Sequence, residues 1–306
     1  MLTGEGADEL IGGYDIFRED KVRRFWARDP QSQLRPLLFR RLNRWLATDP
    51  ARAGAFLTQF YARDLLAVDD PLYSHRLRFA NTARTLRLLR PELREAAADA
   101  DSAERLVRRL PEGFDSFSPL AKAQYLEVVT FFEGYLLHAQ GDRMLMGHSI
   151  EGRFPFVDYR LAELAARLPD SLRLRGLEDK FALRRAAAAY LPDEIRSRPK
   201  VPYRAPIREV FFGEQRPDYV PELLKPAAVE EAGLLDPAAV GRVYAKFDRA
   251  QAGGVSETDE MALVGSISLM LLHERLVVRP ELAPAATPTR VVVGDTARPS
   301  LVAEAV

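Results

Sequence analysis

The sequence predicts a predominantly helical, soluble fold. Apolar residues recur every three or four positions through most of the chain, which is the spacing of a helix with one buried face. No segment shows the alternation of apolar and polar residues that marks a half-buried strand. With 306 residues, of which 47% are hydrophobic, the chain can bury a sizeable core in one or two domains.

The first long apolar pattern lies in the N-terminal part of the chain. In residues 31–46, leucines and Trp45 recur at helical spacing, and Asp49 and Pro50 end the segment because proline cannot continue a helix. The pattern resumes at Phe56, Phe60, Tyr61, Leu65 and Leu66. We therefore expect two successive helices, the first over residues 31–46.

Four later segments carry helix starts or helical patterns. Ser118 and Pro119 are the residue types of an N-cap and a first helical position, and a long apolar helix follows them. Asp158 precedes a further helix. Residues 179–190 are alanine-rich, and residues 256–277 form the last long helical pattern.

The chain after residue 277 has a different composition. Prolines and small polar residues interrupt residues 278–306, which predicts a largely disordered tail. We therefore expect residues 1–277 to hold the folded part of the chain.

The composition excludes several classes of function. Lys plus Arg and Asp plus Glu number 44 each, so no net charge favours a nucleic acid or an acidic membrane as partner. The lack of cysteine excludes disulfides, thiolate catalysis and cysteine-bound metal, and the four histidines show no metal-ligand spacing. The first residues do not read as a signal peptide, and the apolar stretch 261–272 is shorter than the roughly 20 residues that span a bilayer. We expect a cytoplasmic protein with no nucleic acid or membrane partner.

Three segments could carry chemistry, and the first is a glycine-rich acidic loop. Residues 2–14 read Leu-Thr-Gly-Glu-Gly-Ala-Asp-Glu-Leu-Ile-Gly-Gly-Tyr, with Glu5 between two glycines and Asp8 where a helix would begin. One interpretation is an N-terminal turn whose acids are favoured by the helix dipole. The other is a ligand loop with an exposed Glu5 and with Asp8 as an oxygen ligand for Mg²⁺. The residues alone leave both open.

The second segment, residues 141–158, interleaves charged and apolar side chains. Because buried charges must be paired, a buried ion pair of Glu151 with Arg153 or Arg143 is the favoured interpretation. We expect His148 to pack in the core rather than to act as a catalyst.

The third segment, residues 196–203, places Lys200 between two prolines. The chain has only six lysines, so arginine is its usual cation. One interpretation is a solvated loop lysine. The other is a compact positive charge aimed at a phosphate, on an extended loop that the prolines stiffen.

Together these segments resemble the synthetase domain of the glutamine-dependent asparagine synthetase family, over roughly residues 2–277. The family's motif sGeGaDElfgGY matches residues 3–14, and its motif D-R-x-x-M-x-x-S-x-E-x-R-x-P-F-x-D matches residues 142–158. Its K-x-x-L-R, Leu-Pro and R-x-K elements match residues 180–184, 191–192 and 198–200. The three motifs occur in the family's order.

The resemblance implies both a fold and a chemistry. The fold would be the helical C-terminal portion of an α/β doubly wound synthetase domain of the PP-loop ATP pyrophosphatase type. The family uses ATP to convert a carboxylate, typically the aspartate side chain, into an acyl-adenylate, and ammonia from glutamine then gives the amide and AMP. By correspondence with the family, Asp8 would hold Mg²⁺ and Lys200 would stabilise the charge of the phosphates. Glu5 would take a proton from the attacking ammonia, and Arg143 would contact the substrate. The residues that would line the adenylate pocket are Thr3, Gly4 and Gly6.

The sequence also departs from the family. Members carry a glutaminase domain with a cysteine nucleophile and an SGGxDS loop around the pyrophosphate, and neither is found in this sequence. The resemblance therefore implies that most strands of the sheet lie upstream of Met1 and that Met1 and Leu2 end a strand. We expect the chain to be inactive alone and to require the glutaminase and pyrophosphate-loop portion, in cis or in trans.

Two alternatives stay open. The chain could belong to an amide-forming enzyme of the same family that acts on another carboxylate, because the acceptor pocket cannot be recognised in the sequence. It could also be a helical interaction module that has kept the fold and lost the chemistry.

Overall fold

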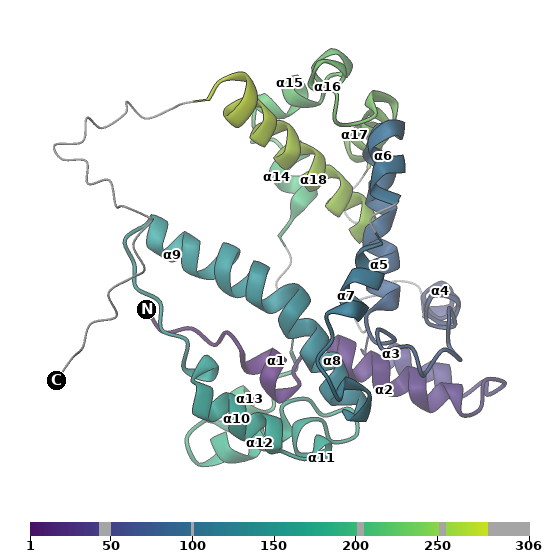
Figure 1. The fold of residues 1–306 in the computed structure, drawn as a ribbon, viewed down its shortest axis with the longest axis vertical. Helices are drawn as coiled ribbons and strands as arrows, with labels where there is room; N and C mark the ends of the chain where they lie inside the picture. The colour runs from purple at the N-terminus through teal and green to yellow at the C-terminus, as the bar shows by residue number, and fades with distance from the viewer. Residues whose placement is uncertain (43–49, 99–100, 201–204, 251–254, 281–306) are drawn as a thin grey trace, which may run out of the picture.

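The computed structural model describes residues 1–42, 50–98, 101–200, 205–250 and 255–280, and they are mostly helical (Figure 1). Within these ranges there is no strand, and only three isolated β-bridges occur. The prediction of a mainly helical chain is confirmed. The doubly wound α/β layer is not seen in the described ranges and stays a prediction. Most of the expected tail, residues 281–306, lies outside them.

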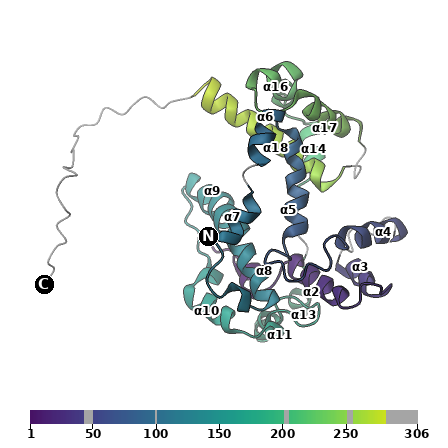
Figure 2. The ribbon, with the colours of Figure 1, turned by 45° about the vertical axis from the view of Figure 1, so that its right-hand side comes forward.

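The chain folds into two lobes that the views of Figures 1 and 2 both separate. The lower lobe holds α1 (Ala7–Ile11), α2 (Asp15–Ala27), α3 (Leu38–Leu42), α4 (Pro50–Tyr61), α7 (Ser102–Arg108), α8 (Pro119–Glu127), α9 (Arg143–Gly147), α10 (Tyr159–Arg167), α11 (Asp170–Arg173), α12 (Phe181–Ala186) and α13 (Asp193–Arg196). The upper lobe holds α14 (Ile207–Phe212), α15 (Tyr219–Leu224), α16 (Pro226–Ala232), α17 (Pro237–Arg249) and α18 (Glu257–His273). Helices α5 (Arg76–Ala83) and α6 (Pro91–Ala98) run between the lobes.

Two predicted helices begin at capped serines, and the cap at Ser118 was itself predicted. Ser118 Oγ accepts a hydrogen bond from the Ala121 amide at 3.2 Å, and Pro119 is the first helical residue of α8. Helix α18 begins with a capping box in which Ser256 and Asp259 each accept from the other's backbone amide. Both predicted starts are confirmed.

The long helix after Ser118 has a feature that the sequence did not predict. From Val128 to Asp142 it adopts π-helical hydrogen bonding, and it then continues into α9. Figure 1 shows α8, this segment and α9 as one rod across the molecule. The rod carries Arg143 away from the start of α8.

The predicted helix over residues 31–46 is wrong in its start. Pro36 lacks the amide that an α-helical turn needs, and the Arg35 amide donates to Ser32 Oγ, so only a 3₁₀ turn forms at Arg35–Leu37 before α3 begins. Residues 43–49, including Trp45, lie outside the described ranges.

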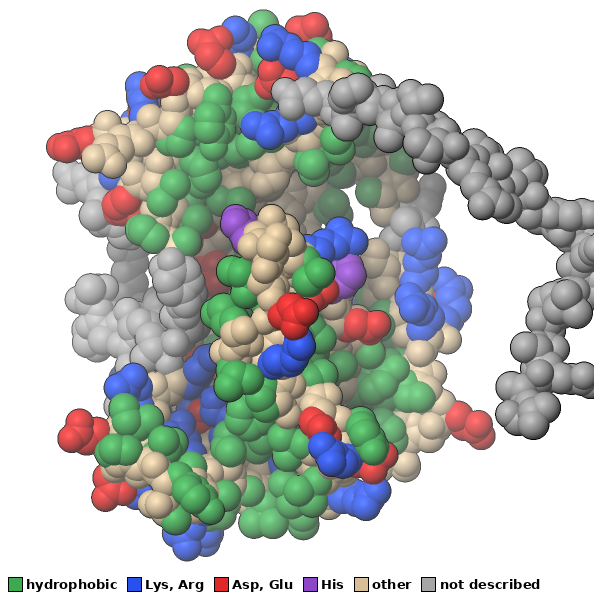
Figure 3. Space-filling model, turned by 90° about the vertical axis from the view of Figure 1, so that its left-hand side faces the viewer, with side chains coloured by type: hydrophobic (Ala, Val, Ile, Leu, Met, Phe, Trp, Pro, Cys, Tyr) green, Lys and Arg blue, Asp and Glu red, His purple; other side chains and the backbone are tan. Residues whose placement is uncertain are grey.

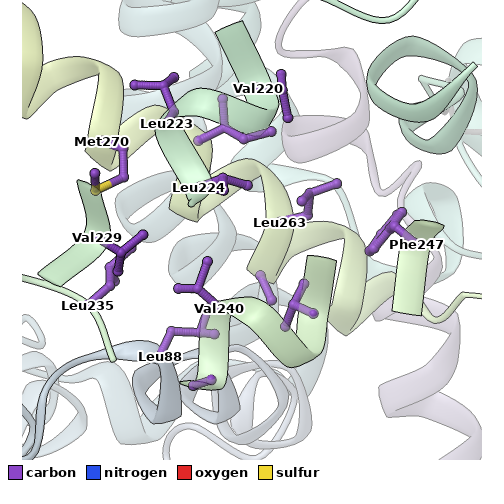
Figure 4. Close-up of a cluster of buried hydrophobic side chains, with 14 residues drawn as sticks. Leu88, Val220, Leu223, Leu224, Val229, Leu235, Val240, Phe247, Leu263 and Met270 are labelled. Carbon is purple, nitrogen blue, oxygen red and sulfur yellow. The ribbon is translucent and has the colours of Figure 1, made fainter. Parts of the chain in front are cut away.

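The upper lobe has its own core, which Figure 4 shows in close-up. Its buried residues are Leu88, Val220, Leu223, Leu224, Val229, Leu235, Ala239, Val240, Val243, Phe247, Ala262, Leu263, Ile267 and Met270. They come from α15 to α18 and from the 3₁₀ segment Arg84–Leu88. The upper lobe therefore has a core formed mainly by its own helices, and the acidic loop belongs to the lower lobe.

Helix α18 and its π-helical continuation, Glu257–Val278, form 22 residues with a mean hydropathy of 1.6. By length and composition this segment could cross a membrane, so the expectation that the late apolar stretch is too short does not hold. A core helix meets the same criteria. Ala262, Leu263 and Ile267 are buried in the upper lobe, and Asp259 is buried beside Lys246. One face of α18 thus packs in the core of the upper lobe, whereas Leu272, Leu276, Val277 and Val278 at the end of the segment are more than half exposed.

The lower lobe is tied together by a buried arginine. Arg23 of α2 donates to the carbonyls of Tyr61, Arg63, Asp64 and Tyr73 at 2.8–3.3 Å. A guanidinium has five donors in a fixed plane, so one side chain can bind several carbonyls at once. Arg23 thus fixes the connection between α4 and α5 to α2.

Candidate functional site

The acidic loop starts from a short parallel contact with a distant part of the chain. The Thr3 amide donates to the Arg153 carbonyl at 3.0 Å, and the Arg153 amide donates to the Met1 carbonyl at 2.8 Å. Leu2 and Arg153 form an isolated parallel bridge. Because the bridge is isolated, the expected strand at Met1 and Leu2 stays a prediction. The bridge places residues of the first and second motifs side by side.

Gly6 allows the chain to turn from this bridge into α1. Its backbone has φ 93°, a left-handed conformation that residues with a side chain rarely adopt. A Cβ at this position would also lie only 2.9 Å from Val157 Cγ2. Helix α1 packs against α8, α10 and α12. The glycine therefore sets the position of the acids that follow it.

Glu9 fixes α1 through hydrogen bonds. Its side chain is buried and accepts from the Tyr14 hydroxyl at 2.7 Å, while Gln124 Nε2 donates to the Glu9 carbonyl at 2.7 Å. Burial raises the pKa of Glu9, although the Tyr14 hydrogen bond opposes this, and burial together with the Glu9 charge raises the pKa of Tyr14. Glu9 is thus a structural acid.

Asp8 points to the other side and is held by two lysines. Lys180 Nζ donates to its Oδ1 and Lys200 Nζ to its Oδ2, each at 2.8 Å. Burial raises the pKa of Asp8, but the hydrogen bonds and charges of the two lysines outweigh it, so the pKa lies below its ordinary value. Asp8 therefore carries a negative charge at neutral pH, inside a site with excess positive charge.

Lys180 is the site residue that the sequence analysis did not identify. Its backbone has φ 48°, a left-handed conformation that is strained for a lysine, and it directly precedes α12. This conformation also explains why the helix expected over residues 179–190 begins only at Phe181. Two signals could have identified Lys180. It is one of only six lysines, and it opens the K-x-x-L-R motif.

Glu5, Thr3 and Gly4 lie on the same loop as Asp8. The Glu5 amide is 3.4 Å from Thr3 Oγ1, and the Glu5 side chain is half-buried. Among the described residues no hydrogen bond or ion pair occupies the Glu5 carboxylate. Gly4 is exposed, and a Cβ there would meet no atom within 4 Å. The loop thus presents a carboxylate that has no partner among the described residues, three residues before the lysine-bound Asp8 of α1.

The second motif does not join this cluster through its charged side chains. Arg143 is exposed at the start of α9, and within the described ranges no hydrogen bond or ion pair links it to Asp8. Glu151 and Arg153 do pair at 2.6 Å, but both side chains are exposed, so the expected buried ion pair is wrong. His148 is also exposed, with Nδ1 2.8 Å from the Met144 carbonyl, and is not a core residue.

The expected helix cap at the end of this motif is confirmed. Asp158 Oδ1 accepts from the Arg160 amide at 3.0 Å at the start of α10. The Arg160 hydrogen bonds hold the pKa of Asp158 at about 2. Asp158 is therefore a capping residue.

A cavity of about 340 Å³ lies beside the two lysines. Apolar side chains from α12 and α13 and a set of cations line it: Lys180, Leu183, Arg184, Ala187, Leu191, Ile195, Arg196, Arg198, Pro199 and Lys200. Of its five cations, Lys180 and Lys200 bind Asp8, while Arg184 binds Asp179 and Arg196 binds Asp193.

Asp8 is the one residue of the site to which the family resemblance assigns Mg²⁺. Both oxygens of Asp8 accept from ammonium groups, and the described residues contain no group of three His, Cys, Asp or Glu side chains that could hold a metal ion. Mg²⁺ binds through one or two carboxylates when phosphates and water complete its shell. Because both Asp8 oxygens bind ammonium groups here, Asp8 would hold Mg²⁺ only where Lys180 or Lys200 gives up one of those oxygens, with phosphate and water completing the shell.

These features define a class of site. A carboxylate between two ammonium groups, with a second carboxylate on the same glycine loop, suits a ligand that carries phosphate and a reaction that moves a proton. Residues 1–274 match the family described as asparagine synthase. The chain belongs to the asparagine synthase family.

Individual relatives show both what the family contains and how much of it this chain covers. The chain is 29% identical to asparagine synthetase [glutamine-hydrolyzing] 1 of Bacillus subtilis over 215 residues, which is 70% of the chain and 32% of that protein. It is 28% identical to amidase chry2 of Gibberella zeae over 254 residues, or 77% of the chain and 36% of that protein. Amidase chyE of Penicillium rubens is 27% identical over 92% of the chain and 42% of its own length.

The chain thus spans about a third of the length of these relatives. No solved structure matches it.

Proposed function

We propose that this chain supplies the catalytic residues of an ATP-dependent ligase that forms an amide from a carboxylate and ammonia. The observation that carries the proposal is the Lys180–Asp8–Lys200 arrangement next to the Glu5 loop. Membership of a family that is ATP-dependent in general supports it.

The residues can be assigned to two steps. In the first, a substrate carboxylate oxygen attacks the α-phosphorus of ATP and pyrophosphate leaves, giving an acyl-adenylate. Lys200 stabilises the negative charge on the phosphates, and Thr3, Gly4 and Gly6 line the nucleotide pocket. Mg²⁺, when bound with the nucleotide at Asp8, would neutralise further phosphate charge.

In the second step, ammonia attacks the acyl carbon, the bond from this carbon to the bridging oxygen breaks, and AMP leaves with that oxygen. The attacking nitrogen must lose a proton, and the Glu5 carboxylate, which has no partner in the described part of the chain, is the base for it. The family motif also assigns a substrate contact to Arg143. Since this residue is exposed at the start of α9, the substrate or a partner segment would have to reach it there.

The whole enzyme needs more than this chain. The portion of the relatives outside the match is the proposed partner, and it would bring the pyrophosphate loop and the glutaminase that releases ammonia. Aspartate is the proposed acceptor, which would make the product asparagine. We propose a cytoplasmic location, in keeping with the composition.

A second candidate keeps the chemistry and changes the acceptor. The similarity to two fungal proteins named amidases, chry2 and chyE, favours it, because the chain matches more of its length to them than to the Bacillus synthetase. The two candidates differ only in which carboxylate stimulates AMP formation.

The test uses the native polypeptide, isolated from its source cells through a C-terminal tag, with whatever co-purifies. Its intact mass shows whether this chain is part of a longer product. AMP formation from ATP is then measured with aspartate and with a panel of other carboxylates, with glutamine or ammonia as donor. We expect carboxylate-dependent AMP formation that Glu5→Gln and Lys200→Met each reduce by about 100-fold or more. AMP formation with a carboxylate other than aspartate would support the second candidate. No AMP with any carboxylate, but retained partner binding in both variants, would identify a non-catalytic interaction module.

A further inference from the structure

Residues 197–200 lead from α13 to Lys200. The Ser197 and Arg198 amides donate back to the Asp193 and Ile195 carbonyls of that helix. Arg198, Pro199 and Lys200 line the 340 Å³ cavity together with Leu183 and Arg184 of α12. The path of this segment therefore depends on what holds its backbone beside the cavity.

One side chain from α12 bridges to this loop. Arg184 Nη1 donates to the carbonyl of Arg198 at 3.0 Å and also to the carbonyl of Arg196. The two carbonyls flank Ser197 and precede Pro199, whose ring fixes φ near −65°. Holding Arg198 therefore also restricts the direction in which the chain continues to Lys200.

Arg184 is itself fixed from behind. Its Nε donates to the Asp179 carbonyl at 3.0 Å and its Nη2 to Asp179 Oδ1 at 2.9 Å. Both side chains are largely buried, with 15% and 7% of their surfaces exposed. Asp179 in turn directly precedes Lys180. One guanidinium thus connects the backbone next to the first lysine with the backbone next to the second.

We propose that Arg184 is the positioning residue for Lys200, acting through the carbonyls of Arg196 and Arg198. The inference rests on the proposed function only in giving Lys200 a catalytic role. A planar guanidinium reaches the Asp179 carboxylate and both carbonyls together, whereas an ammonium concentrates its donors at one atom. Lysine at this position should therefore not substitute for arginine.

The experiment measures how easily Lys200 is modified in the chain without nucleotide. Acetylation by dilute acetic anhydride is followed by peptide mass spectrometry in the wild-type chain and in Arg184→Gln and Arg184→Lys. Arg185→Gln is the matched control, because Arg185 is the exposed neighbour on the same helix. We expect Arg184→Gln to raise the modification rate of Lys200 by about tenfold, as expected for loss of two backbone hydrogen bonds, with Arg185→Gln close to wild type.

Lys180 serves as an internal reference. It binds the same carboxylate, but its carbonyl accepts from the Arg184 amide in the first turn of α12, a backbone contact that the substitution keeps. A rise at Lys200 with little change at Lys180 would support a positioning role. An equal rise at both lysines would show general loosening and overturn the proposal, as would no rise at Lys200.

Two further outcomes are separable. If Arg184→Gln does not fold, Arg184→Lys keeps the charge, and release of Lys200 in that variant is the deciding result. Because modification requires no ATP, selective release of Lys200 in a protein that makes no AMP would leave the positioning role intact and overturn only the proposed function.

Discussion

Asp8 has two ammonium partners, where an exposed aspartate on a loop would usually have none. The two lysines come from positions 172 and 192 residues later in the chain. Lys200 also lies 5.5 Å from the centre of the Tyr14 ring, so its charge is further stabilised by an aromatic face. At the residue scale the site is therefore a cationic pair organised around one carboxylate.

The first prediction concerns this pair. We expect a double-mutant cycle of Asp8→Asn and Lys180→Met to give a coupling free energy of about 1–2 kcal/mol, because both side chains are largely shielded from water. Urea unfolding of the wild type, both single variants and the double variant measures it. Additive effects of the two substitutions would contradict the ion pair.

These contacts mark the limit of sequence reasoning at this scale. The glycine-acid loop and the proline-flanked lysine identified Asp8 and Lys200 as candidates, because unusual residue types occurred in unusual settings. Nothing in the local sequence shows that they touch, since the contact depends on how α1, α12 and the loop after α13 pack. Lys180 was missed for the same reason.

A second ion pair stabilises the upper lobe and gives a pH prediction. Burial raises the pKa of Asp259, but hydrogen bonds from Lys246 and Ser256 outweigh it, so the pKa is below its ordinary value. A lowered folded-state pKa contributes stability above the unfolded value of about 4, and this contribution is lost as pH falls through the folded pKa. We expect Asp259→Asn to cost about 1 kcal/mol at pH 7 and progressively less below pH 4.

Thermal unfolding from pH 2.5 to pH 7 measures this difference. Asp248→Asn, an exposed position on α17, is the control and should change stability by less than about 0.5 kcal/mol at every pH. A cost for Asp259→Asn that does not change with pH would contradict the assignment.

At the scale of elements, α1 is too short to be stable by itself, and its surroundings determine its position. Gln124 from α8 donates to the carbonyls of Glu9 and Leu10, and Arg173 at the end of α11 donates to Gln124 Oε1 at 2.6 Å. The backbone of Gly13 lies against the Asp8 carboxylate. A Cβ at this position would be only 1.9 Å from Asp8 Oδ1. The turn after α1 therefore keeps room for the carboxylate.

Gly13→Ala should consequently disturb the site. We expect it to cost about 1–3 kcal/mol and to displace the Asp8 carboxylate from its lysines. Gly4→Ala is the matched control, because a Cβ at Gly4 meets nothing within 4 Å, and it should alter stability by less than about 0.5 kcal/mol. Chemical denaturation measures the free energy of unfolding of both variants. An equal loss of stability in the two would contradict the close contact between Gly13 and Asp8.

The helices differ in how far their sequences determine them. The start at Ser118 was predictable because capping is local chemistry between a side chain and an amide three residues away, whereas the start at Ser256 was predicted from the helical pattern alone. The 3₁₀ turn at Arg35–Leu37 and the late start of α12 at Phe181 were not, because each depends on one residue, Pro36 or Lys180, overriding a longer apolar pattern. The π-helical segment Val128–Asp142 left no signal in residue spacing.

At the scale of the molecule, much apolar surface is uncovered. Met1, Leu2, Met144, Met146 and Ile150 are all more than 40% exposed. They belong to the N-terminal segment and to α9 and the turn after it. Figure 3 shows hydrophobic side chains over much of the face toward which the α9 end of the rod points. Large uncovered apolar areas usually mark a contact with another chain or segment.

The final prediction tests whether this surface drives association. The relatives are about three times as long as the matched region, and we propose that their remaining portion covers it. Until it is covered, hydrophobic contact between copies is favourable. We therefore expect the isolated chain to associate in sedimentation velocity experiments. The double variant Met144→Gln and Met146→Gln should shift it toward monomer while its unfolding temperature stays within a few degrees of the wild type.

The control is the double variant Arg160→Gln and Glu163→Gln on α10. It changes exposed side chains without removing apolar area, so it should leave association unchanged. If both pairs of substitutions have the same effect, the surface around α9 does not drive association, and the remaining portion of the enzyme must bind elsewhere.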